Sequence, residues 1–301
     1  MPSAIVQRLA FIGFGEAASA VARGLTEAGV RVDMRAYDIK SASDDAAVRE
    51  QLRHDCEAAG VQSCATLEEA LAGAELVFSL VTADQAAAAA RSAASLLAPG
   101  QHFLDCNSCS PGCKAASAAA IATSGAFYSD VAVMAPIYPA RQRTPLLIAG
   151  EQAPTLQSLL ERLGMNATLM PGAVGAASTV KMLRSIMIKG MEALSAECFL
   201  AARSAGIEEQ ILQSLDKSFP GFGWREKAGY NLERMRRHGI RRAAEMREVT
   251  TTLAELGIGN EMASATTVWQ QRIGDLQIRD DSTDLAHQAD SILQRLTGAT
   301  D

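Results

Sequence analysis

The chain has 301 residues and is 48% hydrophobic, which is enough apolar material for one large core or two ordinary ones. Its 28 Lys and Arg residues against 34 Asp and Glu give a formal net charge of -6, which excludes a general electrostatic attraction to nucleic acid. No apolar run approaches the ~18 residues of a membrane span, and six irregularly spaced cysteines indicate a reducing compartment, so we expect a cytoplasmic protein without nucleic-acid or membrane partners.

Short apolar or β-branched runs alternate with alanine-rich segments of helical length in the first half of the chain. This alternation predicts repeated βαβ units, and therefore an α/β fold with a doubly wound, mostly parallel sheet and helices on both faces. The expected strands are residues 9–12, 30–37, 76–81, 102–105, 127–133 and 146–149, and the expected helices are residues 17–28, 46–59, 83–97 and 113–123.

The strand pattern ends at about residue 170, and only helical patterns follow it. We expect helices over residues 173–205, 208–217, 226–256 and 262–273. The break over residues 164–172 predicts a boundary between a sheet domain, residues 1–170, and an all-helical second domain, residues 171–301. A long interdomain helix is expected to lead into the second domain.

The segment FIGFGEAA, residues 11–18, follows the first expected strand, opens the first helix and fits the pattern G-x-G-x-x-A. In this pattern Gly13 permits the tight turn, Gly15 lets the backbone approach a pyrophosphate, and Ala18 allows close packing of helix on sheet. The helix N-terminus then stabilises the anion without a basic side chain. We therefore predict a Rossmann-type dinucleotide site in which Gly13, Phe14, Gly15 and Glu16 contact the cofactor.

An acidic residue, Asp38, ends the second strand 20 residues after Ala18. A carboxylate at this place accepts hydrogen bonds from the ribose hydroxyls of a dinucleotide. Because it would repel a 2′-phosphate, NAD is favoured over NADP, although the nearby Arg35 and Lys40 keep NADP open. The alternative interpretation is an ordinary strand-to-helix turn with a surface acid.

The segment GAVGAASTVK, residues 172–181, opens the long helix and ends on Lys181. Together with the glycine pattern it resembles the β-hydroxyacid dehydrogenase family, which includes 3-hydroxyisobutyrate and 6-phosphogluconate dehydrogenases, over almost the whole chain. The resemblance implies that Lys181 is the general acid/base on the substrate oxygen while hydride passes between substrate carbon and nicotinamide. Partial desolvation can lower the pKa of a lysine enough for this exchange at neutral pH. The alternative is a lysine that only places charge on a helix face.

The segment LDCNSCSP, residues 104–111, resembles the family's strand-end loop over nicotinamide and substrate. It implies that Asn107 lies at the cofactor and Ser108 at the substrate. Since open α/β sheets bind ligands at the carboxyl ends of their strands, Val81 and Thr82 are also expected to line the cofactor. Three cysteines here are interpreted as small loop fillers and not as a metal site, because no histidine or fourth cysteine completes a tetrahedral set: Cys106, Cys109 and Cys113.

The expected substrate loop departs from the family pattern. Where many members have DAPVSGG, this chain has DVAVMAP, residues 130–136. In those members the Ser-Gly-Gly amides bind the substrate carboxylate. Here Pro136 has no N–H and Met134 is bulky. Binding of a substrate anion at Met134, Ala135 and Pro136 must therefore be weaker or take place elsewhere. Four residues after Lys181, Ser185 replaces the usual asparagine and can still hydrogen-bond a substrate oxygen.

A second lysine of the family is absent, because AEM, residues 244–246, stands where Lys-Asp-Leu often occurs. Just upstream, His238, Arg241 and Arg242 cluster, and one of them can supply the missing anion contact because an arginine fork suits a carboxylate. The alternative is a solvated basic helix face. The aromatic segment FPGFGW, residues 219–224, either closes over a larger substrate or packs between two helices.

Three functions stay open. The leading hypothesis is an NAD-dependent dehydrogenase or reductase acting on a small-molecule substrate, a 3-hydroxy acid or related alcohol. An imine reductase on the same architecture is an alternative, but related imine reductases commonly replace the lysine, so Lys181 argues against it. A non-catalytic dinucleotide-binding protein is the third. The apolar surface of the long helix predicts a homodimer or homotetramer built through the second domain, as in the resembled family.

Overall fold

A computed structural model describes residues 6–298. The chain divides after Lys181 into two compact units. We call the residues up to Lys181 the sheet unit and those from Met182 onward the helical unit. The sheet unit contains eight strands in the order β3-β2-β1-β4-β5-β6-β7-β8. All neighbouring strands are parallel except the antiparallel pair β6–β7. This confirms the predicted α/β class.

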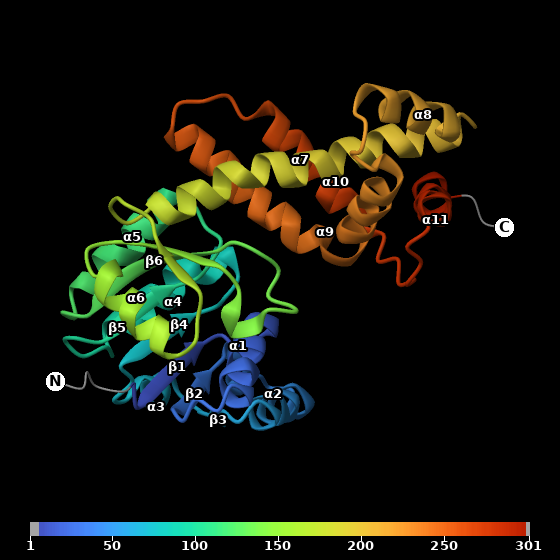
Figure 1. The fold of residues 1–301 in the computed structure, drawn as a ribbon. Helices are drawn as coiled ribbons and strands as arrows, with labels where there is room; N and C mark the ends of the chain where they lie inside the picture. Colours follow the sequence, from blue (N-terminus) through green and yellow to red (C-terminus); the bar gives the residue numbers. More distant parts are fainter. Residues whose placement is uncertain (1–5, 299–301) are drawn as a thin grey trace. The chain divides into compact units, whose positions relative to one another are not determined.

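The strands are β1 (Arg8–Ile12), β2 (Asp33–Tyr37), β3 (Gln62–Ser63), β4 (Leu76–Ser79), β5 (His102–Asp105), β6 (Phe127–Val133), β7 (Leu146–Ala149) and β8 (Ala167–Leu169). The helices of the sheet unit are α1 (Glu16–Glu27), α2 (Ala46–Ala58), α3 (Leu67–Leu71), α4 (Ala86–Ala94), α5 (Pro111–Ala122) and α6 (Ala153–Arg162). Figure 1 shows these helices around the sheet.

Two apolar layers hold the helices on the sheet. Side chains alternate along a strand, so Leu9 and Phe11 of β1 belong to one buried cluster while Ala10 and Ile12 belong to the other. The first cluster includes residues of α1, α2 and α6, and the second includes residues of α3, α4 and α5. Both faces of the sheet are therefore covered, as a doubly wound sheet requires.

The helical unit is built from α8 (Glu208–Ser218), α9 (Trp224–Glu255), α10 (Glu261–Asp275), α11 (Leu285–Thr297) and most of α7 (Ala176–Ser204). Its core includes Phe199 of α7 and Met235 of α9, both buried. Gly239 of α9 meets Gly274 of α10, and a Cβ on Gly239 would lie 2.4 Å from the backbone oxygen of Gln270. Glycine is therefore required where these two helices cross.

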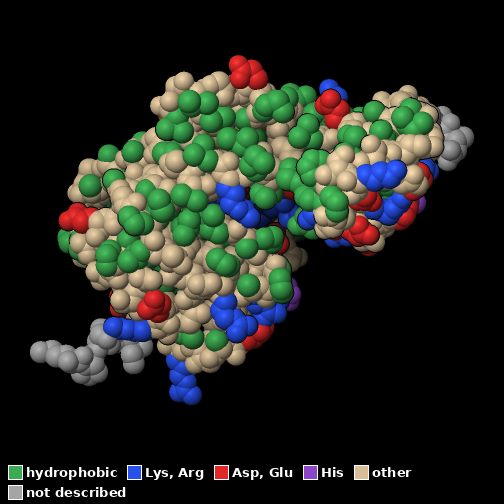
Figure 2. All heavy atoms as spheres, turned by 45° about the horizontal axis from the view of Figure 1, so that its top comes forward, with side chains coloured by type: hydrophobic (Ala, Val, Ile, Leu, Met, Phe, Trp, Pro, Cys, Tyr) green, Lys and Arg blue, Asp and Glu red, His purple; other side chains and the backbone are tan. Residues whose placement is uncertain are grey.

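The first turn of α7 belongs to the sheet unit, so the division comes later than the predicted boundary at residues 170/171. The reason is a set of hydrogen bonds from the beginning of α7 to a carboxylate of β6, described below. Within residues 6–298, no helix has both the length and the apolar character needed to cross a bilayer. Figure 2 shows that hydrophobic side chains are exposed among the charged ones on the face it draws.

Candidate functional site

The turn after β1 forms the expected glycine loop. Gly13 has φ 85, a value that favours glycine, and a Cβ there would lie 2.7 Å from the backbone oxygen of Leu80. Gly15 is the N-cap of α1, and a Cβ on it would meet no protein atom within 4 Å. The fold itself thus requires glycine at position 13, whereas at position 15 the glycine keeps open space in front of a helix N-terminus. That is the arrangement in which a helix binds a phosphate.

Asp38 is fixed by the same loop. Its Oδ2 accepts the Phe14 amide hydrogen at 2.8 Å and its Oδ1 accepts the Lys40 amide hydrogen at 3.0 Å. Each carboxylate oxygen keeps a further lone pair for a ribose hydroxyl. Phe14 itself is 3% exposed, its side chain belongs to the buried core and its amide donates to Asp38, so its contact with a cofactor stays a prediction. Glu16 lies exposed in the first turn of α1.

Asn107 joins the loops after β4 and β5. Its side-chain oxygen accepts the Val81 amide hydrogen at 2.7 Å, and its side-chain nitrogen donates to Ser79 Oγ at 3.0 Å and to Asp105 Oδ1 at 2.8 Å. Both amide donors are used and the residue is buried. Asn107 therefore shapes the predicted cofactor loop, in which Val81 is half-buried and Thr82 exposed, and its own polar atoms are largely committed to the protein.

A fully buried ion cluster lies beneath this loop. Lys114 Nζ of α5 is 2.9 Å from Asp105 Oδ1 and 3.5 Å from Asp130 Oδ1, and all three side chains have no exposed surface. The Tyr128 hydroxyl donates to Asp105 Oδ2 at 2.7 Å. Burial alone would lower the pKa of Lys114, but the neighbouring carboxylates outweigh it and raise that pKa above its ordinary value. Lys114 is therefore a permanent cation shared by a carboxylate at the end of β5 and one within β6.

The same cluster fixes the beginning of α7. Asp130 Oδ2 accepts hydrogen bonds from the Gly175 amide at 3.1 Å, the Ser178 amide at 2.9 Å and the Ser178 hydroxyl at 3.1 Å. A carboxylate at a helix N-terminus also interacts favourably with the helix dipole. Through Lys114, the loop held by Asp105 and the helix held by Asp130 are parts of one network. The sequence reasoning did not find this network.

Lys181 and Ser108 meet at the carboxyl edge of the sheet. Lys181 Nζ donates to Ser108 Oγ at 2.6 Å, and both residues are half-buried. Lys181 comes from α7 and Ser108 from the loop after β5, so the structure brings together two residues that the sequence had placed in one site. This pair is the chemical centre of the candidate site.

The loop after β6 provides few donors for an anion. The Met134 amide donates to the Pro145 carbonyl at 2.9 Å, and Pro136 has no N–H. Met134 also packs beside a small apolar cluster that includes Ala177 of α7. Of the three backbone positions that grip a carboxylate in the resembled family, only Ala135 keeps an amide that no described backbone group accepts.

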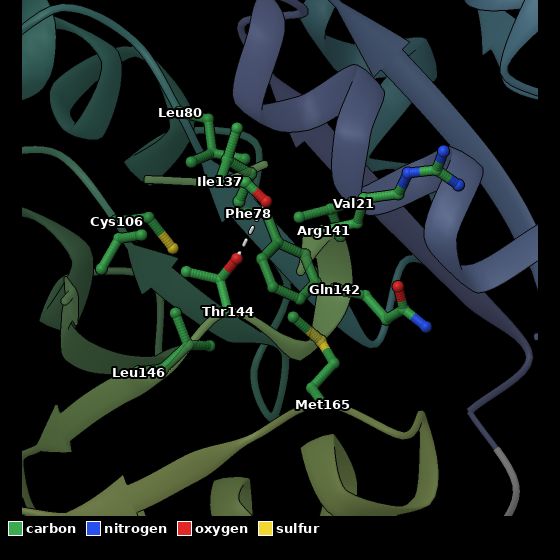
Figure 3. Close-up of a pocket in the computed structure, with 11 residues that line it drawn as sticks. Val21, Phe78, Leu80, Cys106, Ile137, Arg141, Gln142, Thr144, Leu146 and Met165 are labelled. Atoms are coloured by element: carbon green, nitrogen blue, oxygen red, sulfur yellow. Dashed lines mark hydrogen bonds between the residues drawn. The ribbon is translucent and has the colours of Figure 1, made fainter. Parts of the chain in front are cut away.

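A small cavity lies inside the sheet unit near this loop (Figure 3). Its volume is about 20 Å³, which leaves room for a single water molecule. Its walls include Leu80, Cys106 and Ile137, and the Thr144 hydroxyl on its lining donates to the Ile137 carbonyl at 3.1 Å. The cavity is too small for a nicotinamide ring or a substrate, so it is not the candidate site.

The cysteines near the site form no disulfide. Cys106 and Cys109 are buried and Cys113 is half-buried. Burial raises the pKa of Cys106 to about 12, so its thiol is protonated at neutral pH. Within residues 6–298, no group of three or more His, Cys, Asp or Glu side chains is placed to hold a metal ion.

Two predicted substrate residues of the helical unit, Ser185 and Arg242, each lie in a buried polar group. Ser185 Oγ accepts a hydrogen bond from Lys189 Nζ at 3.0 Å, and Lys189 is 2.9 Å from Glu245 Oε2. Arg242 donates to both oxygens of Glu192, at 2.6 and 2.8 Å. The Arg242 side chain is 10% exposed. In this structure the Nη1 of Arg242 is used in a buried ion pair, because a buried Glu192 needs a counter-ion, and the contact of Arg242 with substrate stays a prediction.

The aromatic segment packs on itself. The Trp224 ring centroid lies 4.3 Å from that of Phe222 and 5.8 Å from that of Phe219. Trp224 also packs against the buried core of the helical unit. These contacts support the packing interpretation of this segment over closure on a substrate.

His238 predicts a pH dependence of stability. Burial, together with Arg234 and other arginines of α9, lowers the pKa of His238 from 6.5 to about 4. On acidification the unfolded chain therefore takes up the His238 proton at a higher pH than the folded chain. The stability that the uncharged His238 contributes above pH 6.5 is consequently lost as the pH falls toward about 4. Urea unfolding of the wild type and of His238→Gln at a series of pH values measures this, and the variant should lose less stability on acidification. Identical pH dependences would contradict the assignment.

Comparison with known proteins supports the architecture. A family model described as the NAD binding domain of 6-phosphogluconate dehydrogenase matches residues 8–172, more than half of the chain. The chain belongs to the β-hydroxyacid dehydrogenase family. A second model, described as a domain of unknown function (DUF1932), matches residues 202–273 in the helical unit. This places the chain in a branch of the family with its own C-terminal domain and makes it an NAD(P)-dependent oxidoreductase of this family.

Several solved structures are similar to this chain in fold. A conserved hypothetical protein from Sinorhizobium meliloti 1021 is 35% identical, with 97% of each chain covered and a TM-score of 0.75. The conserved protein MTH1747 of unknown function, whose structure is described as similar to 3-hydroxyacid dehydrogenases, is 29% identical, with 89% of this chain and 97% of that chain covered and a TM-score of 0.68. Mycobacterium tuberculosis 3-hydroxyisobutyrate dehydrogenase is 17% identical, with 96% and 98% covered and a TM-score of 0.72, and shows the shared fold alone.

One curated relative matches over a shorter stretch. It is an uncharacterized 28.5 kDa protein in the 7S RNA 5′ region of Methanothermus fervidus, 31% identical over 78 residues. The match spans 26% of this chain and 31% of that protein.

Proposed function

We propose that this protein transfers a hydride between a nicotinamide dinucleotide and a 3-hydroxy acid or related alcohol, with Lys181 as general acid/base. The observation that carries the proposal is the 2.6 Å hydrogen bond from Lys181 Nζ to Ser108 Oγ at the carboxyl edge of the sheet. Ligands of open α/β sheets bind at this edge. The presence of the lysine favours alcohol or carbonyl chemistry over imine reduction.

The chain's own residues fit a dinucleotide. The space in front of Gly15 at the N-terminus of α1 suits a pyrophosphate, and Asp38 offers its remaining lone pairs to ribose hydroxyls. When bound, the nicotinamide accepts or returns the hydride. In the oxidation direction, the uncharged Lys181 amine accepts the proton of the substrate hydroxyl while the hydride leaves the carbon that bears this hydroxyl. The alcohol thereby becomes a carbonyl and the lysine an ammonium. Ser108 holds Lys181 Nζ in position.

A combined binding and turnover screen tests the proposal. NAD and NADP would be tested against hydroxy acids, polyols and β-hydroxy amino acids, with thermal shift to detect binding and reduced-nicotinamide absorbance to detect turnover. We expect turnover with at least one hydroxy acid or related alcohol. Dinucleotide binding without turnover on the whole panel would instead favour the non-catalytic alternative, and turnover only with imines would favour imine reduction.

NAD should bind more tightly than NADP, because the Asp38 carboxylate accepts ribose hydroxyls and repels a 2′-phosphate. Asp38→Ala should weaken NAD binding by about 10- to 100-fold, the range for losing hydrogen bonds to a charged group, while reducing the bias against NADP. Fluorescence titration of both dinucleotides measures this. Lys40→Ala is a control that keeps the carboxylate and should preserve the NAD preference. Equal or reversed affinities in the wild type would contradict the prediction.

We propose that the protein is a homodimer or homotetramer assembled through the helical unit. Large apolar side chains of α7 and α10 are exposed, with Met187 at 65%, Leu194 at 57% and Met262 at 61%. Exposed large apolar side chains of this kind are typical of an interface. Sedimentation velocity should show a dimer or tetramer at micromolar concentration, and Met187→Glu with Leu194→Glu should shift it toward monomer. Phe127→Glu, in the sheet unit, is the matched control. A monomeric wild type would contradict the proposal.

The location of the protein remains a prediction. The six cysteines all lie in the described part of the chain, and none of them forms a disulfide. Free thiols suit a reducing compartment, and we propose a cytoplasmic location on that ground.

A further inference from the structure

The arginines of α9 nearly all have partners inside the helical unit. Their carboxylate partners are Glu209 for Arg225, Asp280 for Arg236, Glu233 and Asp281 for Arg237, Glu245 for Arg241, and Glu192 for Arg242. Arg247 donates to Gln271. An arginine of α9 that has neither a carboxylate nor an amide partner is therefore an exception.

Arg234 is this exception, because no carboxylate of residues 6–298 lies within 4.0 Å of its guanidinium. Its Nε is buried without a hydrogen-bond partner, as are the Nε atoms of Arg236 and Arg242, but those two arginines have carboxylate partners. The guanidinium carbon of Arg234 lies 6.0 Å from the centre of the Tyr230 ring. Burial, followed by the positive charge of Arg242, lowers the pKa of Arg234, yet an arginine keeps its charge at any physiological pH. Arg234 is thus a partly desolvated cation without a counter-ion among the described residues.

The groups around Arg234 leave an excess of positive charge. Residues 234, 238 and 241 follow one face of α9 at i, i+4 and i+7, which brings His238 beside Arg234 and places Arg241 one turn further along, beside His238. The acid that faces them from α7 is Glu192, but Arg242 and Gln270 already bind its oxygens. His238 is half-buried and uncharged at neutral pH, and its ring can donate an N–H without adding a further charge.

We propose that Arg234 and His238 form a binding site for a small oxyanion, a carboxylate or a phosphate, in the helical unit. A planar guanidinium fork matches the oxygens of either anion, and the neighbouring imidazole N–H supplies a further donor. The site differs from the contact predicted for Arg242, because that guanidinium is occupied by Glu192. It goes beyond the proposed function and does not depend on Lys181.

Histidine NMR provides a direct test, because the chain has only four histidines and His238→Gln identifies the signal. The probes are inorganic phosphate and acetate, each added at constant ionic strength against chloride so that general screening is held fixed. With phosphate or acetate we expect a saturable shift of the His238 signal and a raised His238 pKa, because a bound anion stabilises the imidazolium. The response to each probe tells a phosphate site from a carboxylate site.

Matched variants separate the site from general electrostatics. Arg234→Gln should abolish the saturable response and, without added anion, raise the pKa of His238 because one repelling cation is lost. Arg237→Gln removes the same charge from the same helix at an exposed, already paired position and should keep the response. No saturable response in the wild type, or an equal response in Arg234→Gln, would overturn the proposal. A His238 signal that changes with protein concentration and not with added anion would assign the anion to a second copy of the chain and also overturn it.

Discussion

Replacing Lys181 with methionine should remove most of the turnover while leaving the fold and dinucleotide affinity nearly unchanged. Methionine keeps much of the side-chain volume but cannot exchange a proton, and the residue lies outside the glycine loop that suits the pyrophosphate. A general acid/base typically contributes about 10²- to 10⁴-fold to the rate. Steady-state kinetics with the substrate found in the screen, beside a NAD titration and a thermal melt, would measure all three properties.

The pH profile separates chemistry from binding in this variant. In the oxidation direction, the wild type should lose activity on the acid side as Lys181 becomes protonated, and the residual activity of Lys181→Met should lack this limb. Ser185→Ala is a milder comparison, because the one neutral hydrogen bond expected from the Ser185 hydroxyl to a substrate oxygen contributes only about 0.5–1.5 kcal/mol. Retention of most activity by Lys181→Met on the true substrate would show that another group moves the proton.

The parts of the site that the sequence predicted depend on local pattern. Gly13 and Gly15 are separated by fixed spacing on one strand-to-helix turn, and Asp38 directly follows the next strand, so their positions follow from chain order in a parallel sheet. The meeting of Lys181 with Ser108 followed from the resemblance of two short segments to one family. These predictions needed no knowledge of contacts between distant residues.

The parts that the sequence could not predict depend on distant pairing. Lys114 lies in an alanine-rich helix, where a single lysine normally reaches solvent, and only the folded chain brings it to Asp105 and Asp130. Arg242 belonged to a visible basic cluster, but its partner Glu192 lies 50 residues away. Phe14 occupies a motif position, although its side chain faces the core. In each case the tertiary partner decides the role of the residue.

Short and late elements were also missed. The strand β3 is only two residues long and both are polar, and β8 is only three residues long, so neither strand produces an apolar run. The helix α11 does have apolar residues at helical spacing, including Leu285, Ala289 and Ile292, and an Asp284 N-cap that accepts the His287 amide hydrogen. That pattern was present in the sequence beyond the last helix we expected.

Replacing Lys114 with methionine should lower the free energy of unfolding by about 3–5 kcal/mol, because two buried carboxylates then lose their shared cation. The side chains of Lys114, Asp105 and Asp130 are all 0% exposed, so water cannot take over the role of the ammonium. Denaturant unfolding followed by circular dichroism measures the loss. Arg53→Met is the matched control: it breaks the exposed pair with Glu50, and it should change stability far less than Lys114→Met, because an exposed ion pair contributes little.

A charge-matched variant identifies the cause of the loss. Lys114→Met with Asp130→Asn leaves Asp105 as the single charge, so one cation and two anions become one anion and the net charge of the cluster stays the same. If unpaired charge is what destabilises Lys114→Met, the double variant should be more stable than the single one, since the amide oxygen introduced at position 130 can still accept the Gly175 and Ser178 amides at the beginning of α7. Equal stabilities would mean that the packing of the lysine stem, and not its charge, holds the loop of Asn107 and the helix of Lys181 together.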